Sequence, residues 1–474
     1  MDVSTTASAE SGFLTIGSRL NLTAPSIDDV RQSLANSRQR WLLFLDNADD
    51  TEVDYQQYFP TACAGIIILT SRNSECHQYA TTKTVALDGL PPDEARELLL
   101  RGTHMSTSQH GTYKQDAEQV ATSLLRGHPL ALIQAGAYVA RGHCSLAEYP
   151  RIFQRQRKRL LTFRPRQAQS RYGNVYATFE ASADILQSLQ SEASSDALQL
   201  LSMLAMLASG QLSLSLFQVI WQEARDILQD AIDDADGDED VSHLVTWHVS
   251  HLLPLVEAED ETWDSFRLVE AVHLLEAYSL VVFNGSGDAM SVTMHPLTHA
   301  WARDRQELTQ QQQSWLTAGC MIAMSGTRLS FWQATQQQLR PHLQALVSLE
   351  ASIMFNSGPQ LMVARILLQC GWLLNLLYID KELFALIQDL FARLGIDRHM
   401  ADEKWVELYD LTGRNLSKHG QVKEAVALLE QVVRIREQTL AEDHPSRLAS
   451  QHALAGAYQA VLSFKRNKPN AALI

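Results

Sequence analysis

The sequence predicts an α/β domain followed by a mostly α-helical chain, and three observations support this fold class. Residues 41–45 are a bulky apolar run that ends in an acidic cluster at 46–50, as expected of a buried parallel strand whose carboxyl end opens on a crevice. Residues 65–69 repeat this design and end in a polar, cationic exit at Arg72. Beyond residue 90, apolar side chains recur mostly at helical spacing.

The exits of the two strands predict a ligand site. Carboxyl ends of parallel strands meet at one edge of a sheet, so Asp46 and Arg72 are expected near each other. A carboxylate and a guanidinium at that edge suit a metal-bound phosphate, which suggests a nucleotide site. Two simpler interpretations stay open: an Asp that caps a helix or shapes a loop, and an Arg in a surface salt bridge.

The two strands are expected to lie in a partial α/β domain formed by residues 1–90. The spacing of Ile27, Val30 and Leu34 predicts a short amphipathic helix that leads into the first strand. A further short apolar run at residues 84–87 predicts a third strand.

Residues 91–160 are expected to form a helical domain. Pro92 is followed by two acidic residues, a composition that suits the first turn of a helix. The segment Gly127-His128-Pro129 interrupts the helical pattern and predicts the end of one helix and the start of the next. A plain helix–turn–helix is the simplest interpretation.

Residues 161–305 are expected to form a winged-helix-like domain. A helical pattern at 266–278 is followed by strand-like runs at 279–283 and 290–294, with a turn-forming cluster between them. Pro296 then opens another helix.

The C-terminal part is expected to be helical and repetitive. Residues 306–400 have a helical pattern and are interpreted as a helical linker. Residues 401–474 contain two related phrases, with Leu416 and Tyr458 in corresponding positions, 42 residues apart. This period is longer than the roughly 34 residues of the basic tetratricopeptide unit. Such helical hairpins bury their faces by stacking, and the array in this segment is incomplete.

Composition limits the function classes. The chain has 474 residues and a formal net charge of −15, which argues against a general nucleic-acid or anionic-membrane binder. Much of the acidity lies at residues 226–240, an expected acidic insertion in the winged-helix-like domain. The five cysteines show neither a disulfide framework nor metal-ligand spacing. With no secretory start and no apolar run long enough to cross a bilayer, a cytoplasmic protein is expected.

Four motifs, in this order, resemble those of the NB-ARC family. Residues 42–46 look like the Walker B motif, 69–72 like the sensor arginine, 127–130 like GLPL and 294–297 like MHD. That family belongs to the STAND class of switch ATPases, which is related to the NOD-like receptors. Residues 429–448 resemble the long tetratricopeptide repeats that follow NB-ARC in many fungal members.

The resemblance implies a partial P-loop-type parallel sheet, a helical lid domain, a winged-helix domain and α-helical repeats. It also implies ADP or ATP with Mg²⁺ as cofactors. Asp46 would orient Mg²⁺ and its water ligands, and Arg72 would sense the γ-phosphate. Pro129 would pack on the adenine, with Leu130 of the same motif in the nucleotide-binding set, and His295 would reach the β-phosphate of ADP.

The chain departs from the family pattern in three places. Asn47 stands where a neighbouring acid usually activates water, so at most slow ATP hydrolysis is expected. Pro296 occupies the third MHD position, so only His295 carries that contact over. The phosphate loop Gly-x-x-x-x-Gly-Lys-Ser/Thr is absent, and we expect that the chain starts downstream of it and of any effector domain.

Two functions follow as hypotheses. The first is a nucleotide-controlled signalling switch, immunity- or incompatibility-like, in which ADP keeps the domains together and ATP frees them to form a homo-oligomer. The second is a non-enzymatic scaffold that binds protein partners through its repeats. Neither involves nucleic acid or membrane. A metal site at His295 and His299 is disfavoured, because Pro296 intervenes and no Glu-containing zinc motif accompanies the pair.

Overall fold

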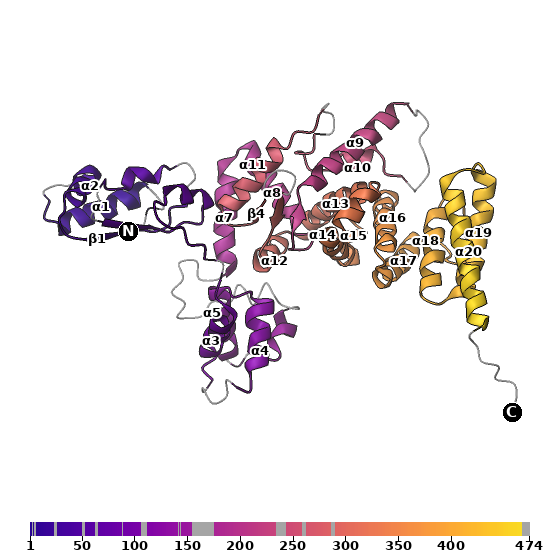
Figure 1. The fold of residues 1–474 in the computed structure, drawn as a ribbon, viewed down its shortest axis with the longest axis horizontal. Coiled ribbons are helices and arrows are strands. Elements are labelled where there is room, and N and C mark those ends of the chain that lie inside the picture. The colour runs from indigo at the N-terminus through magenta and orange to yellow at the C-terminus, as the bar shows by residue number, and fades with distance from the viewer. Residues whose placement is uncertain are drawn as a thin grey trace. The chain divides into compact units, whose positions relative to one another are not determined.

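The chain is mostly helical, with few strands (Figure 1). The computed structural model describes residues 1, 3, 6–22, 26–49, 53–61, 65–87, 89–105, 111–140, 142, 144–153, 175–233, 243–257, 262–285 and 290–466. The chain divides into two compact units: a first unit of residues 1–198, 268–283 and 294–301, and a second unit of residues 199–267, 284–293 and 302–474. The domain boundaries predicted from the sequence stay predictions.

Residue 189 is a convenient point at which to divide the elements along the chain. Up to it they are α1 (Thr6–Arg19), α2 (Ile27–Ala35), β1 (Trp41–Leu45), η1 (Tyr55–Tyr58), β2 (Gly65–Leu69), η2 (Ser74–Tyr79), α3 (Pro92–Gly102), α4 (Lys114–Glu118), η4 (Gln119–Leu124), α5 (Pro129–Ala140) and α7 (Val175–Leu189). After it they are α8 (Glu192–Leu204), β3 (Leu212–Ser213), α9 (Ser215–Asp233), α10 (Thr246–Val249), α11 (Phe266–Ala277), β4 (Val282–Asn284), β5 (Ser291–Thr293), α12 (Pro296–Asp304), α13 (Leu308–Ser325), α14 (Leu329–Val347), α15 (Ala351–Met354), α16 (Gln360–Leu376), α17 (Asp380–Leu394), α18 (Val406–Lys418), α19 (Val422–Thr439) and α20 (Pro445–Arg466).

The two predicted strands of the first unit form and pair in parallel. Their register runs from Trp41 opposite Gly65 to Leu45 opposite Leu69. The predicted helix before β1 is α2, which begins after a capping box in which Ser26 and Asp29 satisfy each other's backbone amides. Both strands therefore end at the same edge of the sheet, as the sequence predicted for their polar exits.

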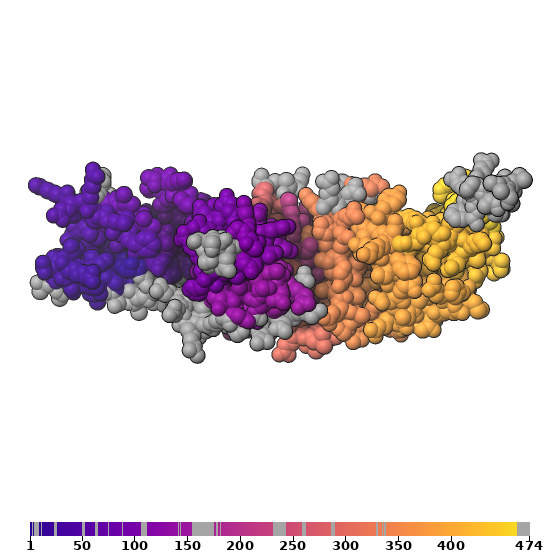
Figure 2. Space-filling view, turned by 90° about the horizontal axis from the view of Figure 1, so that it is seen from below, coloured from indigo at the N-terminus to yellow at the C-terminus, as the bar shows by residue number. Residues whose placement is uncertain are grey.

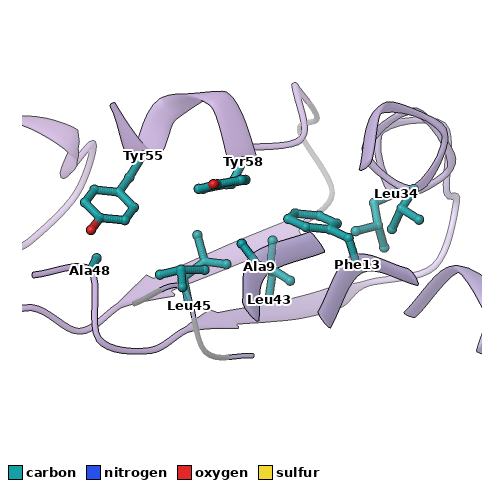
Figure 3. Close-up of a cluster of buried hydrophobic side chains, with 10 residues drawn as sticks. Ala9, Phe13, Leu34, Leu43, Leu45, Ala48, Tyr55 and Tyr58 are labelled. Carbon is teal, nitrogen blue, oxygen red and sulfur yellow. The ribbon is translucent and has the colours of Figure 1, made fainter. Parts of the chain in front are cut away.

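One face of this sheet covers a hydrophobic core (Figure 3). Leu43 and Leu45 point into it from β1 and are nearly inaccessible to solvent. The other side chains of the core are Ala9 and Phe13 of α1, Val30 and Leu34 of α2, Tyr55 and Tyr58 of the short helix η1, and Val3 and Ala48. The Phe13 and Tyr58 rings stack with centroids 5.8 Å apart. Because side chains alternate along a strand, only every second residue of β1 reaches this core.

The other face of the sheet corrects the expectation of a strand buried on both sides. It consists of two cross-strand pairs, Leu42 with Ile66 and Phe44 with Ile68. These four side chains, called the exposed sheet face below, are 62%, 65%, 43% and 41% accessible to solvent. The apolar runs in the sequence suggested that both faces of the sheet are buried, but the described residues cover only one face.

The prediction of a third strand is wrong. Residues 84–87 are not assigned to a strand, and Val85 and Leu87 are 64% and 92% exposed. The run has the composition of a strand but lacks a hydrogen-bonded neighbour, and short apolar runs depend on tertiary pairing for their structure.

The helices of residues 91–140 begin and end where their local signals predict. Helix α3 begins at Pro92. The π-helical turn η4 ends at Leu124, and α5 begins at Pro129 after a turn in which Gly127 has a φ of +71°. A side chain at Gly136 would approach the backbone of Gly102 to 2.8 Å, so glycine permits the close contact of α3 and α5.

The strand pairing of the predicted winged-helix-like region was only partly expected. The runs predicted at 279–283 and 290–294 form the shorter strands β4 and β5. Strand β3, which was not predicted, pairs antiparallel with β5, with Leu212 opposite Val292.

The C-terminal helices α18, α19 and α20 form the expected repeat-like stack, and Figure 2 shows the orange and yellow helices of this unit as a continuous packed surface. A buried ion network joins them. Arg436 of α19, whose side chain is 2% exposed, contacts Asp410 and Glu407 of α18 at 2.6 and 2.5 Å. Asp410 also accepts from Arg414, at 2.8 Å. Both arginines donate to carbonyl groups of α20, at Ser446 and Ala449. No helix in the part of the chain that the structure describes is long and apolar enough to cross a membrane.

Candidate functional site

The segment after β1 is tied to the segment after β2. The Thr70 hydroxyl donates to Asp46 Oδ1 at 2.5 Å, and the Asn47 amide donates to the same hydroxyl at 3.1 Å. Asn47 adopts a left-handed conformation with φ of +63°. The Ala48 amide adds a 2.9 Å bond to the Thr70 carbonyl. Thr70 therefore fixes the orientation of the Asp46 carboxylate, which is only partly buried and can act as an oxygen ligand.

Arg72 is held by several groups of the first unit. Its Nε donates to Asp49 Oδ2 at 2.9 Å, and its own amide donates to Asp49 Oδ1 at 2.7 Å. Its Nη1 donates to the Ser182 hydroxyl of α7 at 2.8 Å, and the Ser279 hydroxyl donates to its carbonyl at 2.6 Å. Sequence reasoning included Asp49 in the acidic cluster but gave it no role of its own.

Two His-Pro-Leu segments form a matched pair. His128 precedes Pro129 at the start of α5, and His295 precedes Pro296 at the start of α12. Each ring accepts a bond from the first turn of its own helix: His128 Nδ1 from the Ala131 amide at 3.4 Å, and His295 Nδ1 from the Leu297 amide at 3.2 Å. The ring centroids lie 6.1 Å apart. The repeated tripeptide was the sequence signal that could have indicated that His128 pairs with His295.

The electrostatics of this pair favour neutral imidazoles. Burial lowers the pKa of His295 to about 4, with smaller contributions from His128 and Arg126. Burial also lowers the pKa of His128. Since Nδ1 of each neutral ring accepts a backbone proton, the ring proton is on Nε2. Each neutral ring therefore carries a hydrogen-bond donor at Nε2.

Helix α7 links the two parts of the site. Ser182 accepts from Arg72, and one turn earlier Phe179 meets the His128 ring edge-on at 6.3 Å between centroids. Glu180 accepts a 2.8 Å bond from the Trp301 indole of α12. The arginine at the exit of β2 and the histidine pair are thus connected through adjacent positions of a single helix.

The predicted site residues fall into two groups. Asp46 and Arg72 follow neighbouring parallel strands, although Asp46 contacts Thr70 and Arg72 contacts Asp49. Pro129, followed by the partly buried Leu130, and His295 lie at the starts of α5 and α12, whose capping rings adjoin. Their shared role in binding one nucleotide stays a prediction.

The donor set limits how Mg²⁺ could be held. Among the described residues, no group of three or more His, Cys, Asp or Glu side chains is arranged to hold a metal ion. Asp46 fits a site in which one carboxylate and phosphate oxygens share the ion, the arrangement that Mg²⁺ usually takes with nucleotides. The residues present are compatible with that kind of site.

Comparison with known proteins gives two matches. The tetratricopeptide repeat family matches residues 412–446, within α18, α19 and the start of α20. A protein of Hyaloscypha variabilis described as a nucleotide-binding leucine-rich repeat (NLR)-like protein is 26% identical over 172 residues. That match covers 31% of this chain and 17% of the relative, so this chain corresponds to a small part of the relative's length. The two matches support an NLR-like protein with tetratricopeptide repeats.

Proposed function

We propose that this chain is part of a cytoplasmic signalling switch of the NB-ARC type, controlled by ADP and ATP and read out through its repeats. The observation that carries the proposal is the placement of Asp46 and Arg72 at the exits of two parallel strands in register. This is the edge where open α/β sheets bind ligands. The similarity to an NLR-like protein supports the same class.

In this proposal each site residue has a chemical task. Asp46, oriented by Thr70, holds Mg²⁺ through oxygen. Arg72 senses the γ-phosphate. Pro129 and Leu130 lie against the adenine, and His295 donates its Nε2 proton to the β-phosphate. Burial lowers the pKa of His295 to about 4 without nucleotide, so the ring is neutral when the nucleotide arrives, and in this proposal Arg72 discriminates between ADP and ATP.

The same proposal predicts a switch with little turnover. Asn47 occupies the position of the acid that would activate water, and its backbone amide is bound to Thr70. Without that base, hydrolysis is slow, and the state of the protein follows exchange of nucleotide. ATP-bound chains form homo-oligomers, whereas ADP-bound chains remain single.

The direct test is thermal unfolding of the whole chain with and without ADP. Binding to the folded state at about 100 times Kd adds roughly 2.7 kcal/mol of stability, which moves the Tm by a few degrees. His295→Ala is expected to reduce that shift, whereas the exposed His452→Ala in α20 is a matched control that leaves it unchanged. Absence of any shift at millimolar ADP would contradict the switch.

A second function, a non-enzymatic scaffold, is favoured by the repeat match at residues 412–446. The ion network pairs the buried charges of Arg436 and Asp410 within this stack. A scaffold retains its protein partners when Asp46 is replaced by Ala and loses them when the repeats are altered. Co-purification of partners with both variants, with and without added ADP, distinguishes the two functions.

A further inference from the structure

We propose that Asp49 is an internal anion that occupies Arg72 in place of a phosphate, so that a phosphate ligand must displace it. The inference rests on the proposed phosphate-sensing role of Arg72. It assigns to Asp49 an autoinhibitory role: the carboxylate sets the anion affinity of the site from within the chain.

The geometry of the pair supports this role. Both Asp49 oxygens are used on Arg72, one by the backbone amide at 2.7 Å and one by Nε at 2.9 Å. The carboxylate therefore takes the position that an external oxyanion would need to approach the Nε side of the guanidinium. Ser182 contacts the opposite part of the group, at Nη1, so the arginine is held from two directions.

The surroundings make the charge of Asp49 effective. The side chains of Asp49 and Arg72 are 14% and 28% exposed, so the pair is mostly shielded from water. Charge interactions are stronger there than on an open surface, and an unpaired cation is costly. Asp46, at the end of β1, is engaged by the Thr70 hydroxyl.

Removal of the Asp49 charge should therefore create an anion site. In Asp49→Asn the guanidinium keeps its Ser182 contact but loses the negative charge of Asp49 at its Nε. An oxyanion that supplies the missing charge is expected to bind at least about tenfold more tightly than it binds the unaltered chain, since a shielded charge pair is commonly worth more than 1.4 kcal/mol.

Inorganic pyrophosphate is the probe, because it carries phosphate oxygens without adenine. We would measure thermal unfolding of the whole chain, unaltered and with Asp49→Asn, in a buffer free of phosphate and sulfate. The expected result is a lower Tm for Asp49→Asn without anion and a rise with pyrophosphate that is at least about tenfold more sensitive than that of the unaltered chain.

Two variants control for general anion effects. Asp28→Asn removes the same charge from the exposed Asp28–Arg31 pair, where Asp28 is 85% accessible, and should leave the pyrophosphate response unchanged. Asp49→Asn combined with Arg72→Gln removes the cation and should abolish the gain. A response of Asp49→Asn no stronger than that of Asp28→Asn would overturn the inference.

The outcome is separable from the test of the switch. An ADP shift in the unaltered chain without a pyrophosphate gain in Asp49→Asn keeps the switch and overturns the role of Asp49. A pyrophosphate gain without any ADP shift supports Asp49 and counts against the switch. If Asp49→Asn does not fold in anion-free buffer, its refolding yield is compared with and without pyrophosphate: rescue supports the inference, and lack of rescue overturns it.

Discussion

The β1–β2 sheet and the α18–α20 stack satisfy their interiors to different degrees. In the stack, the described helices bury their apolar faces, and even the charges of Arg436 and Asp410 are paired inside. In the sheet, one face covers a core while Leu42 and Ile66 on the other are more than 60% exposed. The stack pairs its buried charges, whereas the sheet that carries Asp46 and Arg72 has an apolar face that the described residues leave exposed.

The two regions therefore differ in what their charged residues do. The charged residues that join the helices of the stack are buried, so they cannot change partners without loss of structure. The charged residues of the sheet lie at its edge, where Arg72 and Asp49 retain 28% and 14% exposure, as the proposed exchange of partners with a ligand requires. The stack therefore suits a constant binding surface, and the sheet edge suits a responsive site.

The largest effect is expected from breaking the buried network of the stack. Asp410→Asn removes a fully buried carboxylate that pairs with both Arg414 and Arg436, although Glu407 still contacts Arg436, and should lower the free energy of unfolding by about 3–5 kcal/mol. Denaturant unfolding followed by circular dichroism measures it. The control Glu97→Gln disrupts the exposed Arg101 pair and should cost less than about 0.5 kcal/mol. Equal effects of the two variants would contradict the comparison.

The covered face of the sheet should give the next largest effect. Leu45→Ala removes a fully buried side chain from the core and is expected to destabilise the chain by about 2–4 kcal/mol. Leu42→Ala, three residues earlier on the exposed sheet face, is the matched control and should cost far less. If both variants lose similar stability in the same denaturant titration, the face of Leu42 is covered in solution.

Acid should weaken the histidine pair of the first unit. The pKa of His295 is about 4 in the folded chain, against about 6.5 when unfolded, so the unfolded state binds more protons between these values. Stability from this group is full above pH 6.5 and declines as the pH falls toward 4, by about 1–3 kcal/mol. His295→Gln should flatten this decline in melts recorded across that range. An unchanged slope would show that His295 titrates alike in both states.

The smallest change in stability, with a clear change in association, is expected on the exposed sheet face. Ile66→Lys places a charge where the side chain is 65% accessible and should alter the free energy of unfolding by less than about 0.5 kcal/mol. It should reduce concentration-dependent association, because exposed apolar strands pair with other chains. Light scattering over a concentration series measures this. Association that is unaffected by Ile66→Lys would place the contact elsewhere.

Local signals predicted the elements well. The apolar runs of β1 and β2 and the prolines that open α3, α5 and α12 act within a few residues, so their consequences could be derived from the sequence. The strand expected at 84–87 did not form, because a strand also needs a neighbour. The predicted parallel pairing of β1 and β2 was confirmed. That only one face of this sheet is covered was not predictable, because it depends on which distant segments pack against the sheet.

The candidate site shows the same limit. That Asp46 and Arg72 follow adjacent strands was predictable, because parallel strands end at one edge. The pairing of Arg72 with Asp49 was not predictable, because it depends on the path of the backbone after β1. The adjoining rings of His128 and His295 join positions far apart in the chain, and no local pattern encodes such proximity.

Helix α7 has a mechanical consequence. Three of the four successive positions 179–182 contact other elements. Phe179 contacts His128, Glu180 contacts Trp301 and Ser182 contacts Arg72. Advancing this helix by one residue turns it by roughly 100° and disengages all three partners together. The contacts of α7 with His128, Trp301 and Arg72 are therefore coupled, because a rotation of the helix alters all three together.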